Sequence, residues 1–474
     1  MPDGFVVVTV QSRGTGKSPG YFDPYSPAET RDYAEAIAWA GIQSWSNGKV
    51  GLSGVSYFAT KQWQVAALQP RHLAAIIPWE GCCDFYREWS RHGGIRAQFP
   101  VEWWPRQILP DQHGNGEMML RDAESGENTN GAPLSSEMLE GNRAAFPDEI
   151  LKHVLDDQWY RERTPDFSRV TVPILSAANW GGPGLHLRGN IEGFLAAASA
   201  DKWLSAHIGT HFESFYLPEY VAMQKRFFDR YLKGIENGWE DEPKVQIAVR
   251  GTAGTHRRME HEWPLARTIW QKWYLDAAGM SLDAVPLADV HSVGYRALGD
   301  GLDFSIQPFA AETEITRPVM ARLFVSSSTT DLDLFATLRL LDPAGDEVVF
   351  TGAHEPTPVT RGWLRASHRK LDPERSLPYR PYHSHDEVQK MEAGEIVALD
   401  VEIWPTSIVC PPCYRLVLTL QGRDFEYDTG GRMLHNDPRD RPEDEFGGLN
   451  TLHAGAMYPS YLLLPHIPDL VSSI

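Results

Sequence analysis

Apolar residues in the first half of the chain alternate between short continuous runs and longer stretches with helical spacing. The continuous runs predict strands buried on both faces of a parallel sheet; they are Phe5–Val10 (FVVVTV), Lys49–Ser53, Leu73–Trp79, Val172–Ala177 and Trp203–Ile208. Helical spacing predicts helices over residues 30–45, Thr60–Leu68, Asn190–Ala200 and Pro218–Leu232. This alternation predicts an α/β fold around a parallel sheet.

The pattern changes twice along the chain. Residues 84–167 carry few β-branched runs and many charges, which indicates an inserted, mostly helical segment. From residue 241 onward apolar and polar positions alternate with period two, as at Leu334–Leu340 and Val397–Ile403. Short strands of this kind predict an all-β domain of two sheets, such as a jelly roll. We therefore expect an α/β domain over 1–83 and 168–240, a cap over 84–167 and a β-sandwich over 241–474.

Composition narrows the function classes. The chain has 474 residues, of which 42% are hydrophobic and 23% charged, as in an ordinary globular protein. Its formal net charge of −19 argues against nucleic acid and anionic membranes as partners. No apolar run has the length of a membrane helix, and the N-terminus lacks the features of a signal peptide, so we expect a cytoplasmic location.

The four cysteines indicate neither a disulfide framework nor a metal site. Cys410 and Cys413 have metal-ligand spacing but no second pair, which favours a turn. Neighbouring Cys82 and Cys83 are interpreted as buried packing residues. The sequence predicts no cofactor and no metal.

The segment Gly54–Ala59 (GVSYFA) carries the strongest chemical signal. It follows a predicted strand and precedes a predicted helix, which is the context of a nucleophile elbow. The usual pattern is G-x-S-x-G, and here Phe58 takes the second glycine position and Ala59 follows it. We predict that Ser56 is a catalytic nucleophile.

An activated serine needs a base that an acid orients. His211 lies just after the strand Trp203–Ile208, where the last strands of the sheet would deliver a base; His207 is the alternative, but it is expected inside the strand and more buried. The acid is expected after the strand that ends near Ala177, yet residues 178–184 contain no carboxylate. The next candidate is Glu192, which lies in a predicted helix; it could turn toward the histidine, but its position favours a solvated helix face.

Several segments resemble the cocaine-esterase-like and X-Pro dipeptidyl-peptidase serine hydrolases (CocE/NonD type). The resemblance extends over nearly the whole chain. The segments are VVVTVQSRGTGKSPG, NGKVGLSGVSYFATKQWQVAALQP, DFYREWSRHGG, RFFDRYLKG, VMARLFVSSSTTDLDLFATL and HAGAMYPSYLLLP. The resemblance implies an α/β-hydrolase domain, a helical cap, a C-terminal jelly roll and cleavage of esters or amides through an acyl-enzyme. It assigns Ser56 as nucleophile, His211 as base, the Tyr57 backbone N–H as an oxyanion donor and Trp89 as an acyl-pocket residue.

The chain departs from the family in two places. The family acid is an aspartate in a G-W-x-D-type stretch, whereas Asn179–Gly182 (NWGG) has glycine at that position. In the family, a strand with a tyrosine that serves as the second oxyanion donor precedes the strand matching FVVVTV, and this sequence does not contain it. A sheet strand between FVVVTV and KVGLS is missing as well. We expect that the sequence is an N-terminally shortened form of a longer hydrolase, with impaired stability and turnover.

The sequence thus predicts a serine hydrolase that acts on a small-molecule ester or a short peptide. Two alternatives remain open. One is an X-Pro dipeptidyl aminopeptidase, which needs a carboxylate for the free amine of its substrate. The other is a catalytically impaired or dead hydrolase that acts as a binding protein, which the missing acid and tyrosine favour. The sequence is also compatible with a homo-oligomer.

Overall fold

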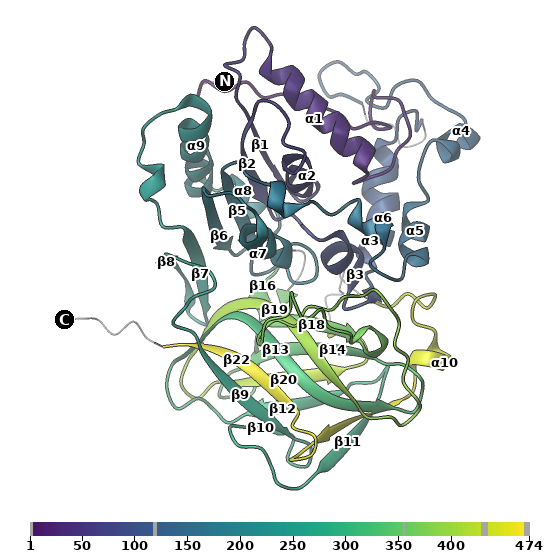
Figure 1. Ribbon diagram of the computed structural model, residues 1–474, viewed down its shortest axis with the longest axis vertical. Coiled ribbons are helices and arrows are strands. Elements are labelled where there is room, and N and C mark those ends of the chain that lie inside the picture. The colour runs from purple at the N-terminus through teal and green to yellow at the C-terminus, as the bar shows by residue number, and fades with distance from the viewer. Residues whose placement is uncertain (1–2, 117–120, 354–355, 428–434, 469–474) are drawn as a thin grey trace, which may run out of the picture.

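The computed structural model describes residues 3–116, 121–353, 356–427 and 435–468. Its N-terminal half is built on a parallel sheet in the order β1–β2–β5–β6–β7, and β8 joins the end of this sheet antiparallel to β7. The strands are β1 (Val50–Val55), β2 (Leu73–Trp79), β5 (Ile174–Asn179), β6 (Lys202–His207), β7 (Val245–Gly251) and β8 (Gly254–Glu260). The predicted parallel α/β arrangement is therefore present (Figure 1).

Helices cover both faces of this sheet. Side chains on one face, such as Leu52 and Ile76, pack with Trp63 of α2 and Ile37 of α1. Residues of the opposite face, such as Ile77, pack under Phe227 of α9. The helices of this part are α1 (Pro27–Gly41), α2 (Tyr57–Ala66), α7 (Leu187–Ala196), α8 (Glu213–Tyr216) and α9 (Pro218–Lys233), with a 3₁₀ turn, η5 (Trp239–Asp241). Alternate residues of each strand thus bury against opposite helices, which explains the continuous apolar runs.

The strand predicted over Phe5–Val10 is wrong. These residues form no strand, and the side chains of Val6, Val7 and Val10 are 60%, 63% and 54% exposed. Among the described residues, β1 pairs only with β2, so no ladder receives the segment. Phe5 instead contacts Phe228 of α9. A β-branched run favours a strand only where a neighbouring strand accepts its backbone hydrogen bonds.

The inserted segment consists of short helical pieces and one small hairpin. Its elements are η1 (Phe85–Ser90), β3 (Arg91–His92), β4 (Ile95–Arg96), α3 (Phe99–Trp103), η2 (Trp104–Ile108), η3 (Leu109–Asp111), α4 (Ser136–Gly141), α5 (Phe146–Lys152), α6 (Gln158–Arg161) and η4 (Phe167–Arg169). Its core is largely aromatic and includes Phe85, Trp89, Trp103 and Phe146. Four of the 16 tryptophans of the chain lie in this insertion and contribute to its core: Trp89, Trp103, Trp104 and Trp159.

The C-terminal half is almost entirely antiparallel. Its elements are β9 (Ile269–Asp276), β10 (Ser281–Asp283), β11 (His291–Arg296), β12 (Leu302–Ile306), β13 (Thr313–Ser327), β14 (Asp333–Leu341), β15 (Glu347–Val348), β16 (Phe350–Thr351), β17 (Pro356–Thr357), β18 (Thr360–Arg365), η6 (Ala366–His368), β19 (Val397–Cys410), β20 (Arg415–Gln421), α10 (Glu443–Phe446), β21 (Leu449–Ala454) and β22 (Tyr461–Ile467). Strand pairing runs in a closed circuit through β13, β19, β18, β14, β20, β12, β10, β9 and β22. This ring, rather than two separate sheets, encloses the largest hydrophobic cluster.

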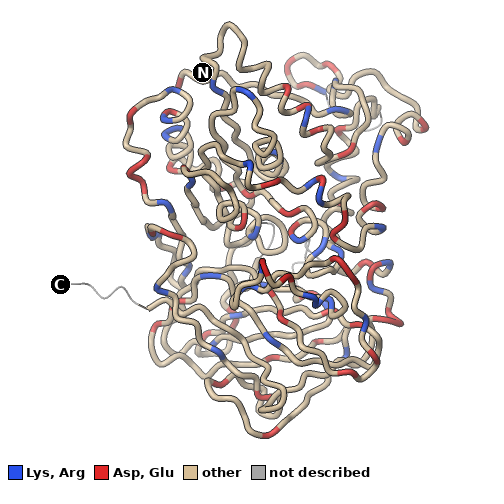
Figure 2. The backbone as a smooth tube through the Cα atoms, viewed as in Figure 1, with Lys and Arg blue, Asp and Glu red and all other residues tan. Residues whose placement is uncertain are grey.

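Buried ion pairs join the insertion to the C-terminal strands. Arg91 of β3 contacts Asp440, and Asp440 also contacts Arg365 at the end of β18. Arg188 of α7 contacts both Glu88 of the insertion and Glu402 of β19. Figure 2 shows charged residues of both signs where the two halves meet. No helix in the described parts of the chain combines the length and hydropathy needed to cross a bilayer.

Candidate active site

Ser56 lies in a sharp turn between β1 and α2. Its backbone has φ 64° and ψ −115°, a conformation that non-glycine residues rarely adopt and that is typical of a nucleophile elbow. Its N–H donates to the carbonyl oxygens of Trp79 and Glu80, each at 3.0 Å. A Cβ at Gly54 would lie 2.5 Å from the Cβ of Phe58, so the strand needs glycine there.

The unusual sequence of this elbow has a structural explanation. The side chain of Phe58 is 68% exposed and points away from the core, so no glycine is needed at that position. The close approach occurs one residue later, where fully buried Ala59 packs against Gly81; a Cβ on Gly81 would lie 2.6 Å from that of Ala59. The elbow therefore has small residues where the backbones meet.

His211 is held by a carboxylate that the sequence analysis did not select. Nδ1 of His211 lies 2.8 Å from Oε2 of Glu80, and Nε2 of His207 lies 3.0 Å from Oε1 of the same side chain. Glu80 directly follows β2, is fully buried, and has a φ of 49°. The amide of Asn179 also donates to Oε1 of Glu80, at 3.3 Å.

Glu80 is an anion at neutral pH. Burial alone raises the pKa of its carboxyl, but the hydrogen bonds and charges of His207 and His211 outweigh burial and bring its pKa below the ordinary value of 4.5. A buried carboxylate on Nδ1 fixes the orientation of His211 and stabilises a positive charge on its ring.

A second histidine contacts the serine directly. Oγ of Ser56 lies 3.1 Å from Nε2 of His186, a buried residue at the position that precedes α7. The rings of His186 and His211 lie almost parallel, with centroids 5.1 Å apart and an angle of 14° between their planes. Ser56, His186, His211 and Glu80 thus form one cluster at the ends of β1, β2, β5 and β6.

The structure also places the two other residues that the sequence offered as base and acid. Glu192 lies on α7, where its carboxylate pairs with Arg380 of the C-terminal half, whereas Glu80 is the carboxylate that contacts His211. His207 is the last residue of β6 and fully buried, as expected, and it helps to hold Glu80. The sequence signal for Glu80 is a carboxylate that directly follows Leu73–Trp79, the buried strand next to the elbow strand.

Trp89 lies one layer behind the residues that adjoin the nucleophile. It is 1% exposed and packs edge-on against Trp103, with ring centroids 5.2 Å apart. Trp103 in turn stacks on Tyr57, the residue after the serine, at 6.0 Å. The hydroxyl of Tyr57 donates to buried Glu29 of α1 at 2.5 Å.

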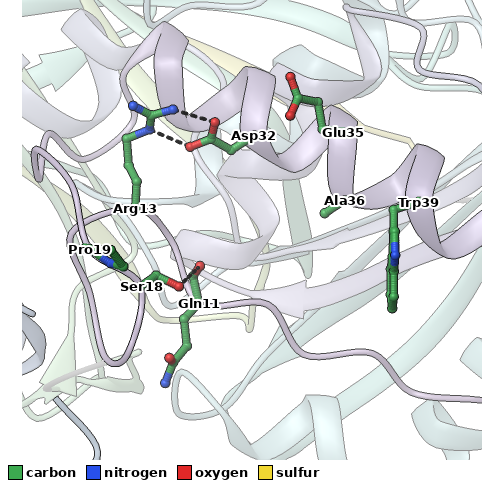
Figure 3. Close-up of a pocket in the computed structure, with 8 residues that line it drawn as sticks. All are labelled: Gln11, Arg13, Ser18, Pro19, Asp32, Glu35, Ala36 and Trp39. Carbon is green, nitrogen blue, oxygen red and sulfur yellow. Dashed lines mark hydrogen bonds and ion pairs between the residues drawn. The ribbon is translucent and has the colours of Figure 1, made fainter. Parts of the chain in front are cut away.

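A separate hollow lies beside α1, in a different place from the residues that carry the chemistry. It measures about 500 Å³ and is lined by Gln11, Arg13, Asp32 and Trp39 among others. Figure 3 shows Arg13 paired with Asp32 at this hollow. None of its lining residues belongs to the serine–histidine cluster.

Comparisons with known proteins agree with this geometry. Residues 1–213 match the X-Pro dipeptidyl-peptidase (S15 family) model, and residues 237–463 match the model of the X-Pro dipeptidyl-peptidase C-terminal non-catalytic domain. A cocaine esterase from Rhodococcus sp. (strain MB1 Bresler) is 26% identical over 540 residues, which cover 98% of this chain and 88% of the esterase.

Solved structures show the same relationship. A CocE/NonD family hydrolase from Staphylococcus aureus is 32% identical, with a TM-score of 0.84 over 96% of this chain and 79% of that chain. An aminopeptidase from a marine sediment Thaumarchaeota archaeon, 16% identical, shares the fold, with a TM-score of 0.69 over 96% of this chain and 82% of its own. The elbow serine and the histidine that a carboxylate holds agree with these matches. The matches show that the chain belongs to the CocE/NonD family of serine hydrolases, which includes the cocaine-esterase-like and X-Pro dipeptidyl-peptidase enzymes.

Proposed function

We propose that Ser56, His211 and Glu80 form the catalytic triad of an esterase. The observation that carries this proposal is the 2.8 Å contact between Nδ1 of His211 and the buried carboxylate of Glu80. A histidine held in this way presents Nε2 as the proton acceptor. The mechanism requires Oγ of Ser56 to turn about the Cα–Cβ bond from its contact with His186 to the stacked His211 ring.

The reaction then follows the order of acyl transfer. Oγ of Ser56 forms a bond to the substrate carbonyl carbon as its proton passes to Nε2 of His211. That proton next passes to the leaving alcohol oxygen, and the carbon–oxygen bond to the alcohol breaks. Water gives a proton to His211 and attacks the acyl carbon, and Ser56 recovers its proton as the carboxylic acid leaves.

The backbone N–H of Tyr57 serves as an oxyanion donor. Tyr57 is the first residue of α2, and the first N–H groups of a helix have no acceptor within the helix. The oxyanion therefore forms at the positive end of the helix dipole. Tyr57 and Trp103 line the acyl side of the site, and Trp89 supports them from behind.

The substrate class is a small ester without a free amine close to the scissile bond. A dipeptidyl-peptidase holds the substrate amine with a carboxylate, and the buried carboxylates around the elbow have cationic or hydrogen-bonding partners. Glu80 contacts two histidines, Glu192 contacts Arg380, and Glu29 contacts Lys61. Cleavage of X-Pro peptides remains the second candidate, because the family model that matches residues 1–213 carries that name.

The proposal also includes the domain architecture, the cellular location and the partners of the protein. Residues 1–83 and 168–240 form an α/β-hydrolase domain, residues 84–167 its cap, and residues 241–474 a jelly roll whose strands close into the ring described above. The enzyme acts in the cytoplasm, and its partners are its small-molecule substrates.

Labelling by a fluorophosphonate probe tests the proposal, since only an activated serine reacts. The wild-type chain should be labelled and should hydrolyse p-nitrophenyl acetate, whereas Ser56→Ala should show neither activity. A wild-type chain that is folded but unlabelled would support the alternative of a catalytically dead binding protein. Faster turnover of Ala-Pro-p-nitroanilide than of p-nitrophenyl acetate would assign the peptidase activity instead.

A further inference from the structure

His186 has a position that the triad does not use. It follows the glycine-rich loop 181–184 and directly precedes α7, and its side chain is only 2% exposed. Its Nε2 lies 3.1 Å from Oγ of Ser56, and its ring stacks on His211. This places a buried imidazole beside the side chain that attacks the substrate in the proposed mechanism.

We propose that His186 is a second catalytic histidine that donates a hydrogen bond to the oxyanion, beside the N–H of Tyr57. The proposal rests on the triad described above. Once Oγ of Ser56 has turned to His211, the oxyanion of the tetrahedral intermediate, two bonds away from Oγ, occupies the place beside Nε2 of His186. Histidine side chains are among the groups that form oxyanion holes. No proton is transferred by His186, because the proton from Ser56 passes to His211.

The surroundings of His186 suit a side chain that stabilises a negative charge. The N-terminus of a helix carries a partial positive charge, which disfavours a cation and favours an anion there. The adjacent His211 ring becomes positively charged when it accepts the proton, and two stacked cations would repel each other. A neutral imidazole at this position remains able to donate its Nε2 proton as a hydrogen bond.

The helix that carries His186 is fixed to the strand that carries Glu80. Asn190 of α7 accepts a hydrogen bond from the N–H of Gly81 and donates one to the carbonyl of Pro78, both at 2.8 Å. Gly189 lies so close to the neighbouring chain that an added Cβ would be 2.6 Å from Cα of Cys82. The position of His186 relative to the elbow is therefore set before substrate binds, as an oxyanion donor requires.

Two variants at the same position separate donation from proton transfer. The side-chain amide of His186→Gln can donate a hydrogen bond but cannot act as a base, and His186→Ala can do neither. With p-nitrophenyl acetate, His186→Ala should lower kcat by about 10²–10³-fold and change KM by no more than about threefold. The kcat of His186→Gln should be at least about tenfold higher than that of His186→Ala.

A tetrahedral inhibitor gives an independent readout. Phenylboronic acid forms an anionic adduct with a reactive serine, and its affinity should fall in His186→Ala and recover in His186→Gln in parallel with kcat. His453→Gln, a histidine substitution in β21, is a matched control that should leave both quantities at the wild-type value. Thermal unfolding of each variant checks that it is folded.

Three results would overturn the inference. His186→Gln as inactive as His186→Ala would mean that the imidazole acts as a base or only as a structural group. His186→Ala with wild-type kcat would mean that it has no catalytic role. If His186→Ala bound phenylboronic acid as tightly as the wild type does, His186 would make no stabilising contact with the anionic adduct. Failure of the triad itself is distinguishable, because Ser56→Ala would then retain hydrolysis.

Discussion

At the scale of single residues, Glu80 contacts both Ser56 and His211, the proposed nucleophile and the proposed base. Its backbone carbonyl accepts the N–H of Ser56, and its carboxylate holds His211. Its φ of 49° is uncommon for a residue with a side chain, and backbone strain of this kind concentrates at functional sites. If Glu80 is the triad acid, as proposed, the end of β2 supplies the carboxylate that the segment Asn179–Gly182 lacks.

The first prediction concerns this carboxylate. Glu80→Gln should lower kcat on p-nitrophenyl acetate by about 10⁴-fold, because an amide can donate to Nδ1 and so favours the wrong tautomer of His211. Glu192→Gln is the matched control, since Glu192 pairs with Arg380, and its turnover should stay close to that of the wild type. Equal losses in both variants would contradict the assignment of Glu80.

The pH dependence of stability tests the same residue. The hydrogen bonds from His207 and His211 lower the pKa of Glu80 below 4.5 in the folded state. A carboxyl with a depressed pKa stabilises the fold above its ordinary pKa, and this contribution is lost as pH falls through the folded value. The wild type should therefore exceed Glu80→Gln in urea unfolding free energy at pH 7, and the difference should shrink as the pH falls below about 4.5. A constant difference from pH 7 to pH 3 would contradict this expectation.

At the scale of elements, the elbow shows what can be read from sequence. The order strand, serine, helix was predictable from the apolar run before Ser56 and the helical spacing after it. The identity of the close contacts was not predictable, because the approach of Ala59 to Gly81 depends on how α2 lies against the end of β2. The strand predicted over Phe5–Val10 is wrong for the same reason. Strand pairing depends on tertiary structure, and a β-branched run does not indicate whether a partner strand lies beside it.

A compensating pair of substitutions tests this geometry. Gly54→Ala should lower turnover by about 10²-fold, since its Cβ would lie 2.5 Å from Cβ of Phe58 and displace the elbow. Adding Phe58→Gly removes the clashing atom and should restore most of the turnover, at a cost of about 1 kcal/mol in stability for glycine in a helix. Phe58→Ala keeps Cβ, so the pair Gly54→Ala with Phe58→Ala is the control that should stay impaired. Equal recovery with alanine and glycine would contradict the proposed clash.

At the scale of the whole molecule, buried charges couple the insertion to the C-terminal strands. Asp440 contacts Arg91 at 2.7 Å and Arg365 at 3.0 Å, and Arg365 also contacts Asp333. Sequence periodicity separated these regions along the chain, but it could not indicate that residues some 350 positions apart form one buried network, because ion-pair partners leave no periodic trace. We infer that the insertion and the C-terminal strands unfold together.

Removal of the central carboxylate of this network tests the coupling. Burial raises the pKa of Asp440, but Arg365 and Arg91 outweigh burial and hold it well below the ordinary 3.8. Asp440→Asn leaves buried guanidinium groups without their anion, so its unfolding free energy at pH 7 should fall by about 3–5 kcal/mol. Because the depressed pKa stabilises the fold fully above 3.8 and this contribution fades as pH falls toward the folded pKa, the loss should diminish as the pH falls below about 4. Urea unfolding should show one cooperative transition in the wild type.

Glu127→Gln, which removes an exposed pair with Lys17, is the control that should leave the curve unchanged. An Asp440→Asn curve that overlies the wild type at pH 7 would mean that the network does not hold the two parts together.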